Sequence, residues 1–243
     1  ALSEHLSPPQ SFDFLNTYLG KIGPVIRKHS GFIDKYIGDA IMAIFPDQVE
    51  DAIEASIEML HVLAEFNALR QTQGLSQIHI GIGLHTGTVM LGTIGEEQRM
   101  ESTVISDAVN LASRLEGLTK RYGASVIISE QAFTRIAHPE HYHVRFLGKI
   151  QLKGKREIIS AVELYDGDPE PVKSLKIQTT TDFERGLRHY FAKEFVEAAV
   201  LFQKVLKVNF RDKTARLFLE RAAELMVQNI PNTWQGVEAI EDK

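Results

Sequence analysis

A carboxylate and a lysine stand out in the stretch FIDKYIGDAIMAIFP, residues 32–46. Two apolar, β-rich runs flank the pair Gly38-Asp39, and this pattern predicts a hairpin with Asp39 at its turn. A carboxylate at a hairpin tip is well placed to hold a hard cation such as Mg²⁺, which prefers carboxylate oxygens together with substrate phosphates. Because Asp and Gly are common turn residues, an ordinary solvated turn is the alternative.

Lys35 lies on the first predicted strand, four residues before Asp39. Strand alternation would place Lys35 on the same face as Ile33 and Ile37. A lysine between two isoleucines indicates either a charge at an edge or an interface, or a polar side chain that faces a ligand.

A second polar pair lies in TVISDAVNLASRLEG, residues 103–117. The spacing of apolar residues predicts a helix over 107–122, so Asn110 and Arg114, at i and i+4, share one helical face. An amide can hold a ribose or orient a phosphate, and a guanidinium binds phosphate oxygens with a fixed fork of donors. The simpler alternative is a solvated asparagine and an arginine paired with Glu116 or another acid.

A third set of polar residues is the stretch LKGKRE, residues 152–157. Lys153 and Lys155 flank Gly154 between two predicted strands. A charged hairpin of this kind is usually solvated surface, but it also suits a polyphosphate.

These polar residues need a scaffold, and helical and strand periodicities alternate along the first two thirds of the chain. Hairpins occur beside longer crossovers, which favours an α+β sandwich over a purely parallel sheet. The predicted helices are 8–29, 48–70, 107–122 and 130–137, and the predicted strands are 32–37, 40–45, 77–91, 124–129, 143–155 and 158–165.

The composition changes at DGDPEPVKSLK, residues 166–176, where prolines, glycine and charges indicate a linker. Beyond it the sequence is expected to be all-helical. Gly186, Ala198 and Phe202 fall at offsets like those of tetratricopeptide (TPR) repeats, although the expected aromatic is one position out. The alternatives are a short helical bundle and a tail that binds protein. The expected domains are 1–167, a linker at 168–176 and a TPR-like tail at 177–243.

Composition excludes several classes of protein. The chain of 243 residues has a net charge of −5, which argues against a general nucleic-acid binder. It has no cysteine, so disulfides, thiolate zinc sites and cysteine nucleophiles are excluded. No apolar run approaches the roughly 18 residues that span a bilayer, so this region is expected to be soluble. A cytoplasmic location is expected for this region, and a full-length protein could be membrane-attached.

Together the segments GFIDKYIGDAIMAIFP, IGIGLHTGTVMLGTIGEEQRMESTVISDAVNLASRLEGL and LGKIQLKGK resemble the class III nucleotidyl cyclase catalytic domain, in the family's order and spacing, across roughly residues 1–165. The resemblance implies a ferredoxin-like α+β sandwich, with a mixed, mainly antiparallel sheet and flanking helices. It also implies conversion of ATP to 3′,5′-cyclic AMP and pyrophosphate.

The resemblance implies a role for each matching residue. Asp39 resembles one of two aspartates that hold two Mg²⁺ or Mn²⁺ ions. Lys35 and Thr103 resemble the purine-reading pair, and they point to ATP because a guanylate cyclase typically has Glu and Cys there. Asn110 resembles the ribose-positioning asparagine, and Arg114 resembles the arginine that stabilises the pentavalent transition state.

Lys155, with Lys153 as second choice, resembles the lysine that contacts the terminal phosphates. In the family the sites lie at a head-to-tail dimer interface, with metal ligands from one subunit and the other groups from its partner. This chain carries both kinds, which implies a homodimer with two equivalent sites. Residues 93–103 resemble the hairpin that reaches across to the partner. Family members are commonly fused to an upstream sensor.

Two features depart from the family pattern. Ser106 stands where glycine is usual, and serine is a good helix N-cap, so the helix should survive. The strand with the other metal aspartate is expected upstream of Ala1, and the chain is expected to be inactive without it. The alternatives are a catalytically inactive regulatory homologue and a guanylate cyclase. A diguanylate cyclase is more remote, because it needs a GG[DE]EF-type turn and the turn here is IGDAI.

Overall fold

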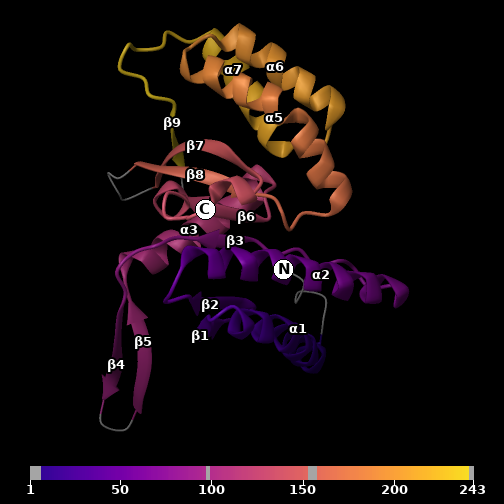
Figure 1. Ribbon diagram of the computed structural model, residues 1–243, viewed down its shortest axis with the longest axis vertical. Coiled ribbons are helices and arrows are strands. Elements are labelled where there is room, and N and C mark those ends of the chain that lie inside the picture. The colour runs from indigo at the N-terminus through magenta and orange to yellow at the C-terminus, as the bar shows by residue number, and fades with distance from the viewer. Residues whose placement is uncertain (1–6, 97–98, 153–157, 241–243) are drawn as a thin grey trace. The chain divides into compact units, whose positions relative to one another are not determined.

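The computed structural model describes residues 7–96, 99–152 and 158–240 (Figure 1). The chain divides into two compact units, one made of Ala1–Ile80 and Thr86–Asn110 and the other of Gly81–His85 and Leu111–Lys243.

The first unit is built on two long helices and a hairpin. Helices α1 (Pro8–Lys28) and α2 (Val49–Thr72) pack together, and α1 also contacts strand β1 (Phe32–Ile37). β1 pairs antiparallel with β2 (Ala40–Ile44). The helices bury aliphatic side chains at helical spacing, which is what an amphipathic helix requires: Ile22, Val25, Ile26, Ile53, Met59 and Leu63.

A second hairpin belongs to the same unit and consists of β4 (Met90–Glu96) and β5 (Arg99–Ile105). Its register is regular from Met90↔Ile105 to Glu96↔Arg99. Every residue of β4 is exposed although the strand contains Met90, Leu91 and Ile94. Strand β4 of this hairpin (labelled in Figure 1) therefore presents apolar side chains to the surroundings.

The second unit contains a five-stranded mixed sheet in the order β3-β6-β8-β7-β9. β3–β6 and β7–β9 are parallel pairs, and β6–β8 and β7–β8 are antiparallel. The strands are β3 (Ile82–Leu84), β6 (Val126–Ser129), β7 (Val144–Leu152), β8 (Ile158–Leu164) and β9 (Val237–Ile240), with α4 (Glu130–Phe133) and the 3₁₀ helix η2 (Pro139–His141) between β6 and β7. The mixed sheet with flanking helices confirms the predicted α+β class.

Helix α3 (Asp107–Tyr122) begins in the first unit and continues into the second. Its apolar face packs onto the sheet and forms one core with Leu111, Leu115, Leu118, Tyr122, Ala124, Ile127, Leu147, Ile150, Ile159 and Ala161. β3 lies very close to α3, because a Cβ added to Gly83 would meet Ala112 O at 2.1 Å and Glu116 N at 2.4 Å. Only glycine permits this approach, which fixes the helix against the strand.

Three helices follow the sheet and belong to the same unit: α5 (Glu170–Phe191), α6 (Phe195–Val208) and α7 (Lys213–Met226). They share an aromatic core, to which Phe146 of β7 is added, and in Figure 1 they lie over β7. Gly186 of α5 leaves room for the ring of Phe202, since an added Cβ would lie 2.9 Å from it. The small residue at this predicted repeat offset thus has a packing role.

A buried charge cluster joins these helices to the sheet. Arg145 of β7 pairs with Glu163 of β8 and with Asp212 at the start of α7, and Lys176 of α5 pairs with Glu163 and Asp168. All five side chains are buried, so each charge depends on its partners for the interactions that water would otherwise provide.

Residues 168–176 are not the predicted linker. Helix α5 begins at Glu170, and both Asp168 and Lys176 are buried in the charge cluster. The prolines that suggested a linker lie at the N-cap and the second helical position, where a missing N–H costs nothing because the first helical N–H groups have no partner within the helix. The boundaries between the two compact units fall after Ile80, His85 and Asn110, and not at 167 or 177.

Two further predictions differ from the structure. Residues 77–91 do not form one strand: only Ile82–Leu84 and the start of β4 at Met90 are strand. The backbone of Ile78 instead exchanges hydrogen bonds of 2.7 and 2.8 Å with the side chain of Asn67. The tail is not all-helical, because it ends in β9, whose Glu238 pairs with Arg121 and Arg221 and accepts a hydrogen bond from Tyr122 at 2.8 Å. Among the described helices, none is long and apolar enough to cross a membrane.

Candidate active site

The β1–β2 hairpin places Asp39 at its tip, as predicted. Ile37 pairs with Ala40, so Gly38 and Asp39 form a two-residue turn, and Gly38 has a left-handed φ of 63°. Glycine adopts this conformation without the Cβ clash of other residues, which explains the tight turn. The carboxylate of Asp39 is exposed and offers oxygen ligands of the kind that Mg²⁺ prefers.

The pKa of Tyr18, in helix α1, is affected by the charge of Asp39. Burial raises the pKa of the Tyr18 phenol to about 12, and the negative charge of Asp39 adds to the shift. Tyr18 was not singled out from the sequence, where it looks like one more apolar position of the helix.

Lys35 lies in β1 beside a β-bulge, and this corrects the predicted strand face. Ile33 pairs with Ala43 and Lys35 with Met42, so the intervening Asp34 is the extra residue of the strand. Because adjacent partners on β2 point to opposite faces, Ile33 and Lys35 do not share a face, whereas Lys35 and Ile37 still do.

Asp34 is a feature that sequence reasoning missed. Its side chain is only 6% exposed, and its Oδ2 lies 3.2 Å from Lys35 Nζ. This oxygen forms the ion pair with Lys35, but it accepts no hydrogen bond from any described residue. The half-buried Lys35 is thus held beside a buried acid, which limits where its ammonium group can point. The adjacent Asp-Lys pair in a strand was the available signal.

Thr103, the second predicted base-reading residue, lies on β5 and pairs with Gly92 of β4. It belongs to the first unit with Lys35 and Asp39. Lys153 and Lys155, the predicted phosphate contacts, lie outside the described residues, in the connection between β7 and β8.

Ser106 starts helix α3 in the predicted way. Its Oγ accepts a hydrogen bond from Ala108 N at 3.0 Å and donates one to Thr88 O at 2.6 Å. The hydroxyl therefore caps the helix and also ties it to the segment before β4. Serine in place of the family glycine is accommodated by these two hydrogen bonds.

Asn110 and Arg114 lie one turn apart on α3. Asn110 is exposed, and Arg114 is half-buried. The Nη1 of Arg114 is buried and has no hydrogen-bond partner among the described residues. Burying a guanidinium nitrogen without a hydrogen-bond partner costs free energy. A catalytic role or a bound ion is among the explanations of such a group in a native protein. An oxyanion at this position would satisfy the nitrogen.

The structure brings the predicted residues together as two pairs, Lys35 with Asp39 on one hairpin and Asn110 with Arg114 on one helical face. The first pair offers a carboxylate and an ammonium group within one turn of hairpin. The second offers an amide and a guanidinium whose buried Nη1 has no hydrogen-bond partner among the described residues. These are the groups that a nucleoside triphosphate with a bound divalent cation requires.

The chain belongs to the family described as the adenylate and guanylate cyclase catalytic domain, whose pattern it matches over residues 1–163. It is 48% identical over 170 residues to an adenylate cyclase of Anabaena cylindrica, with 68% of this chain and 34% of that protein covered. It is 36% identical over 224 residues to the terminal-differentiation-specific adenylate cyclase of Dictyostelium discoideum, with 90% of this chain and 10% of that protein covered.

Among solved structures the chain is similar to the guanylyl cyclase Cya2, with a TM-score of 0.58 and 31% identity over 70% of this chain and 87% of that one. The chain thus spans about a third of the Anabaena protein and a tenth of the Dictyostelium protein. The Dictyostelium match covers most of the helical tail as well as the cyclase region.

Proposed function

We propose that this chain is the catalytic region of an adenylate cyclase that converts ATP to 3′,5′-cyclic AMP and pyrophosphate. The observation that carries the proposal is the buried Nη1 of Arg114, which lies one helical turn from Asn110 and has no hydrogen-bond partner in the part of the chain that the structure describes. In this reaction the ribose 3′-oxygen forms a bond to the α-phosphorus, and the bond from the α-phosphorus to the bridging oxygen of the leaving pyrophosphate breaks.

Each residue has a task in this proposal. The amide of Asn110 positions the ribose, and Arg114 stabilises the negative charge that gathers on the phosphoryl group during transfer. Lys35 and Thr103 read the adenine edge, while Lys155 or Lys153 binds the terminal phosphates.

Asp39 would hold Mg²⁺ or Mn²⁺, expected as two ions per site, together with a second aspartate expected upstream of Ala1. Bound metal would lower the pKa of the 3′-hydroxyl and neutralise the leaving group. The exposed carboxylate at the hairpin tip fits this ligand type, because Mg²⁺ is usually bound through one or two carboxylates and substrate phosphates.

We also propose that the active form is a head-to-tail homodimer with two equivalent sites. The β4–β5 hairpin supports this, because Met90, Leu91, Ile94 and Ile105 are all exposed on it. Exposed apolar side chains gathered on one element mark an interaction surface. A second copy of the chain, which would contribute the complementary set of site residues, is the proposed occupant.

Guanylate cyclase activity is the second candidate, because Cya2, at 31% identity, is a guanylyl cyclase. Lys35 and Thr103 favour ATP, since the pair typical of GTP is Glu and Cys. A catalytically inactive homologue that only dimerises is a third candidate. Against it stands the presence of five of the expected polar site residues: Lys35, Asp39, Thr103, Asn110 and Arg114.

The deciding experiment measures cyclic nucleotide production from ATP and from GTP, with Mg²⁺ and with Mn²⁺. It uses the chain as printed and a longer form that begins upstream of Ala1. Cyclic AMP from the longer form supports the proposal, whereas no cyclic product from either nucleotide would refute the enzyme function. A preference for GTP would refute the roles of Lys35 and Thr103.

For the whole protein we propose a signalling role, in which this region is the cytoplasmic output region of a protein with an upstream sensor.

A further inference from the structure

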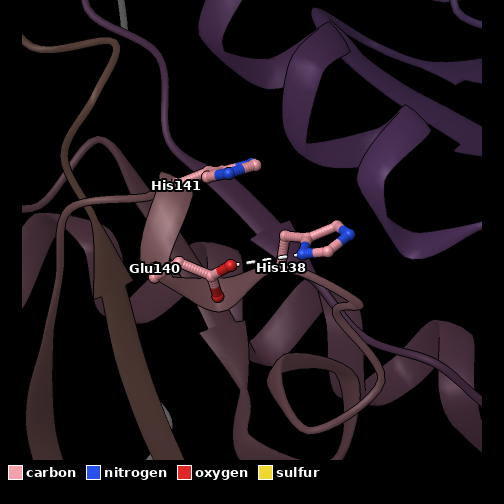
Figure 2. A group of neighbouring side chains, drawn as sticks. All are labelled: His138, Glu140 and His141. Carbon is pink, nitrogen blue, oxygen red and sulfur yellow. Dashed lines mark hydrogen bonds and ion pairs between the residues drawn. The ribbon is translucent and has the colours of Figure 1, made fainter.

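Two histidines and a glutamate gather in the second unit, in the connection from α4 to β7. Figure 2 shows His138, Glu140 and His141 around one turn of chain. One ligand atom from each of the three lies within 4.8 Å of the others. None of these residues has a task in the proposed cyclase reaction.

The backbone explains why the side chains meet. Pro139 begins the 3₁₀ helix η2, in which His141 N donates to His138 O at 3.1 Å and Tyr142 N donates to Pro139 O at 3.2 Å. With three residues per turn, side chains at i and i+3 are eclipsed. The rings of His138 and His141 are accordingly stacked, with centroids 5.2 Å apart and planes at 22°. Proline fixes φ, so part of this arrangement is set before any ligand binds.

Glu140 completes the group of ligand atoms. Its Oε1 lies 3.2 Å from Nδ1 of His138, and both side chains are about two-thirds exposed. Glu140 therefore offers a carboxylate oxygen beside two imidazoles, and all three residues are exposed.

We propose that His138, Glu140 and His141 bind one divalent transition-metal ion of the Zn²⁺ class at the surface of the second unit. Two imidazoles and one carboxylate form a ligand set that Zn²⁺, Co²⁺ and Ni²⁺ accept, whereas Mg²⁺ prefers oxygen ligands and retains water. This ligand set leaves a fourth position of a tetrahedral ion open to water.

The distances suit such an ion. With metal–ligand bonds of about 2.0–2.2 Å, neighbouring ligands of a tetrahedral ion lie about 3.3–3.6 Å apart. The 3.2 Å between Glu140 Oε1 and His138 Nδ1 is already close to this value. The wider separations, at most 4.8 Å, can close by rotation of exposed side chains, which few neighbours oppose.

A neighbouring histidine provides a matched control. His143 is two residues from His141, but Asp166 engages both its ring and its backbone: Nδ1 lies 2.7 Å from Oδ1, and the backbone N donates to Oδ2 at 2.7 Å. His143→Gln should therefore leave metal binding intact. His61, exposed on α2 in the other unit, is a second control for the loss of one surface imidazole.

The test is a calorimetric titration of the untagged protein with Zn²⁺ in the presence of excess Mg²⁺, which occupies sites that prefer oxygen. Co²⁺ absorption reports the coordination geometry. Wild type, His143→Gln and His61→Ala are expected to bind one ion per chain. His138→Ala and His141→Ala should bind at least about tenfold more weakly, equivalent to about 1.4 kcal/mol, and Glu140→Gln should also weaken binding.

Absence of Zn²⁺ binding by the wild type would overturn the proposal, as would equal binding by all variants. Loss of binding in His143→Gln to the same extent would show that the ligand set is wrong. Circular dichroism checks that each variant is folded, and the milder His141→Gln provides a second version of the key variant. None of these readouts requires cyclase activity, so the outcome is separate from that of the proposed function.

Discussion

Arg145 and Asp212 form a buried ion pair between the sheet and the last helix of the second unit, with Nη1 of Arg145 2.6 Å from Oδ2 of Asp212. Arg145 also pairs with Glu163, and its guanidinium lies over the ring of Phe183, 4.6 Å from the centroid. Asp212 caps α7 by accepting a hydrogen bond from Ala215 N at 3.0 Å. One arginine thus connects two strands, the start of a helix and the aromatic core of the tail.

Removal of Arg145 should destabilise the second unit strongly. Arg145→Met leaves Glu163 and Asp212 buried without their shared cation, and breaking a buried pair in this way typically costs about 3–5 kcal/mol. Denaturant unfolding followed by tryptophan fluorescence measures the change, since Trp234 packs on the same aromatic core. Arg216→Met removes an exposed arginine from α7 and should change stability by less than about 0.5 kcal/mol. Equal unfolding midpoints for both variants would contradict this prediction.

Stability should fall in acid partly through Asp212. Burial alone would raise the pKa of this carboxyl group, but Arg145 and the helix-capping hydrogen bond lower it below its usual value. Since the folded-state pKa is the lower one, this contribution is present above the unfolded pKa of about 3.9 and is lost as the pH falls through the folded value. Unfolding free energies measured from pH 7 to about 3 should decline less steeply at the acid end for Asp212→Asn. An identical acid slope in the two proteins would argue against the pairing.

Glycine at position 83 should be required for close contact between β3 and α3. Gly83→Ala introduces a Cβ that would meet backbone atoms at 2.1 and 2.4 Å, and backbone cannot rotate away as a side chain can. Overpacking of this kind costs about 1–3 kcal/mol or more. Gly117→Ala is the matched control, because an added Cβ there has nothing within 4 Å. In helix α3 this control should stabilise the protein by about 0.5–1 kcal/mol. Thermal unfolding of both variants decides the point.

Arg114→Ala should lower kcat by about a thousandfold or more if Arg114 stabilises the transition state as an arginine finger does. Folding should be little affected, because the change removes a buried nitrogen that has no partner among the described residues. Lys120→Ala, on an exposed position of the same helix, should keep wild-type turnover. The measurement is ATP turnover by the longer form of the chain. Undiminished turnover by Arg114→Ala would remove its proposed role.

Exchange of the proposed base-reading pair should change the substrate. Lys35→Glu combined with Thr103→Cys should lower kcat/KM for ATP and raise that for GTP, and each lost hydrogen bond should contribute about tenfold. The single variants show whether both positions contribute. Because Lys35 pairs with Asp34 at 3.2 Å, Lys35→Glu also creates an acidic neighbour pair, so stability should be measured alongside. An unchanged ATP preference in the double variant would refute the assignment.

Local chemistry made parts of this fold predictable. The Gly38-Asp39 turn and the Ser106 cap depend on residues adjacent in sequence, and the structure confirms both. The bulge at Asp34, the bonds from Asn67 to Ile78 and strand β9 were not predicted. Each of these depends on a partner that lies elsewhere in the chain, and periodicity within one segment carries no information about it.

The same distinction applies to the candidate site. The resemblance identified the residue types, and the structure adds surroundings that spacing does not reveal. Examples are the buried carboxylate of Asp34 beside Lys35 and the buried Nη1 of Arg114, which no described residue hydrogen-bonds. The linker prediction failed for a related reason. In a sequence, proline at the start of a helix cannot be told from proline in a loop. The structure shows that these prolines begin helix α5, and that Asp168 and Lys176 on either side of them are buried.

The last strand has a consequence for the order of folding. Glu238 of β9 accepts a hydrogen bond from Tyr122, a residue 116 positions earlier, and the strand pairs in parallel with β7. During synthesis, the edge of β7 that pairs with β9 therefore has no partner strand until residues 237–240 have left the ribosome. Contacts between residues so far apart in sequence form slowly, because loop-closure entropy is lost before they are made. Because β9 follows α5, α6 and α7 in sequence, its edge partner β7 is translated before all three helices and β9 after them.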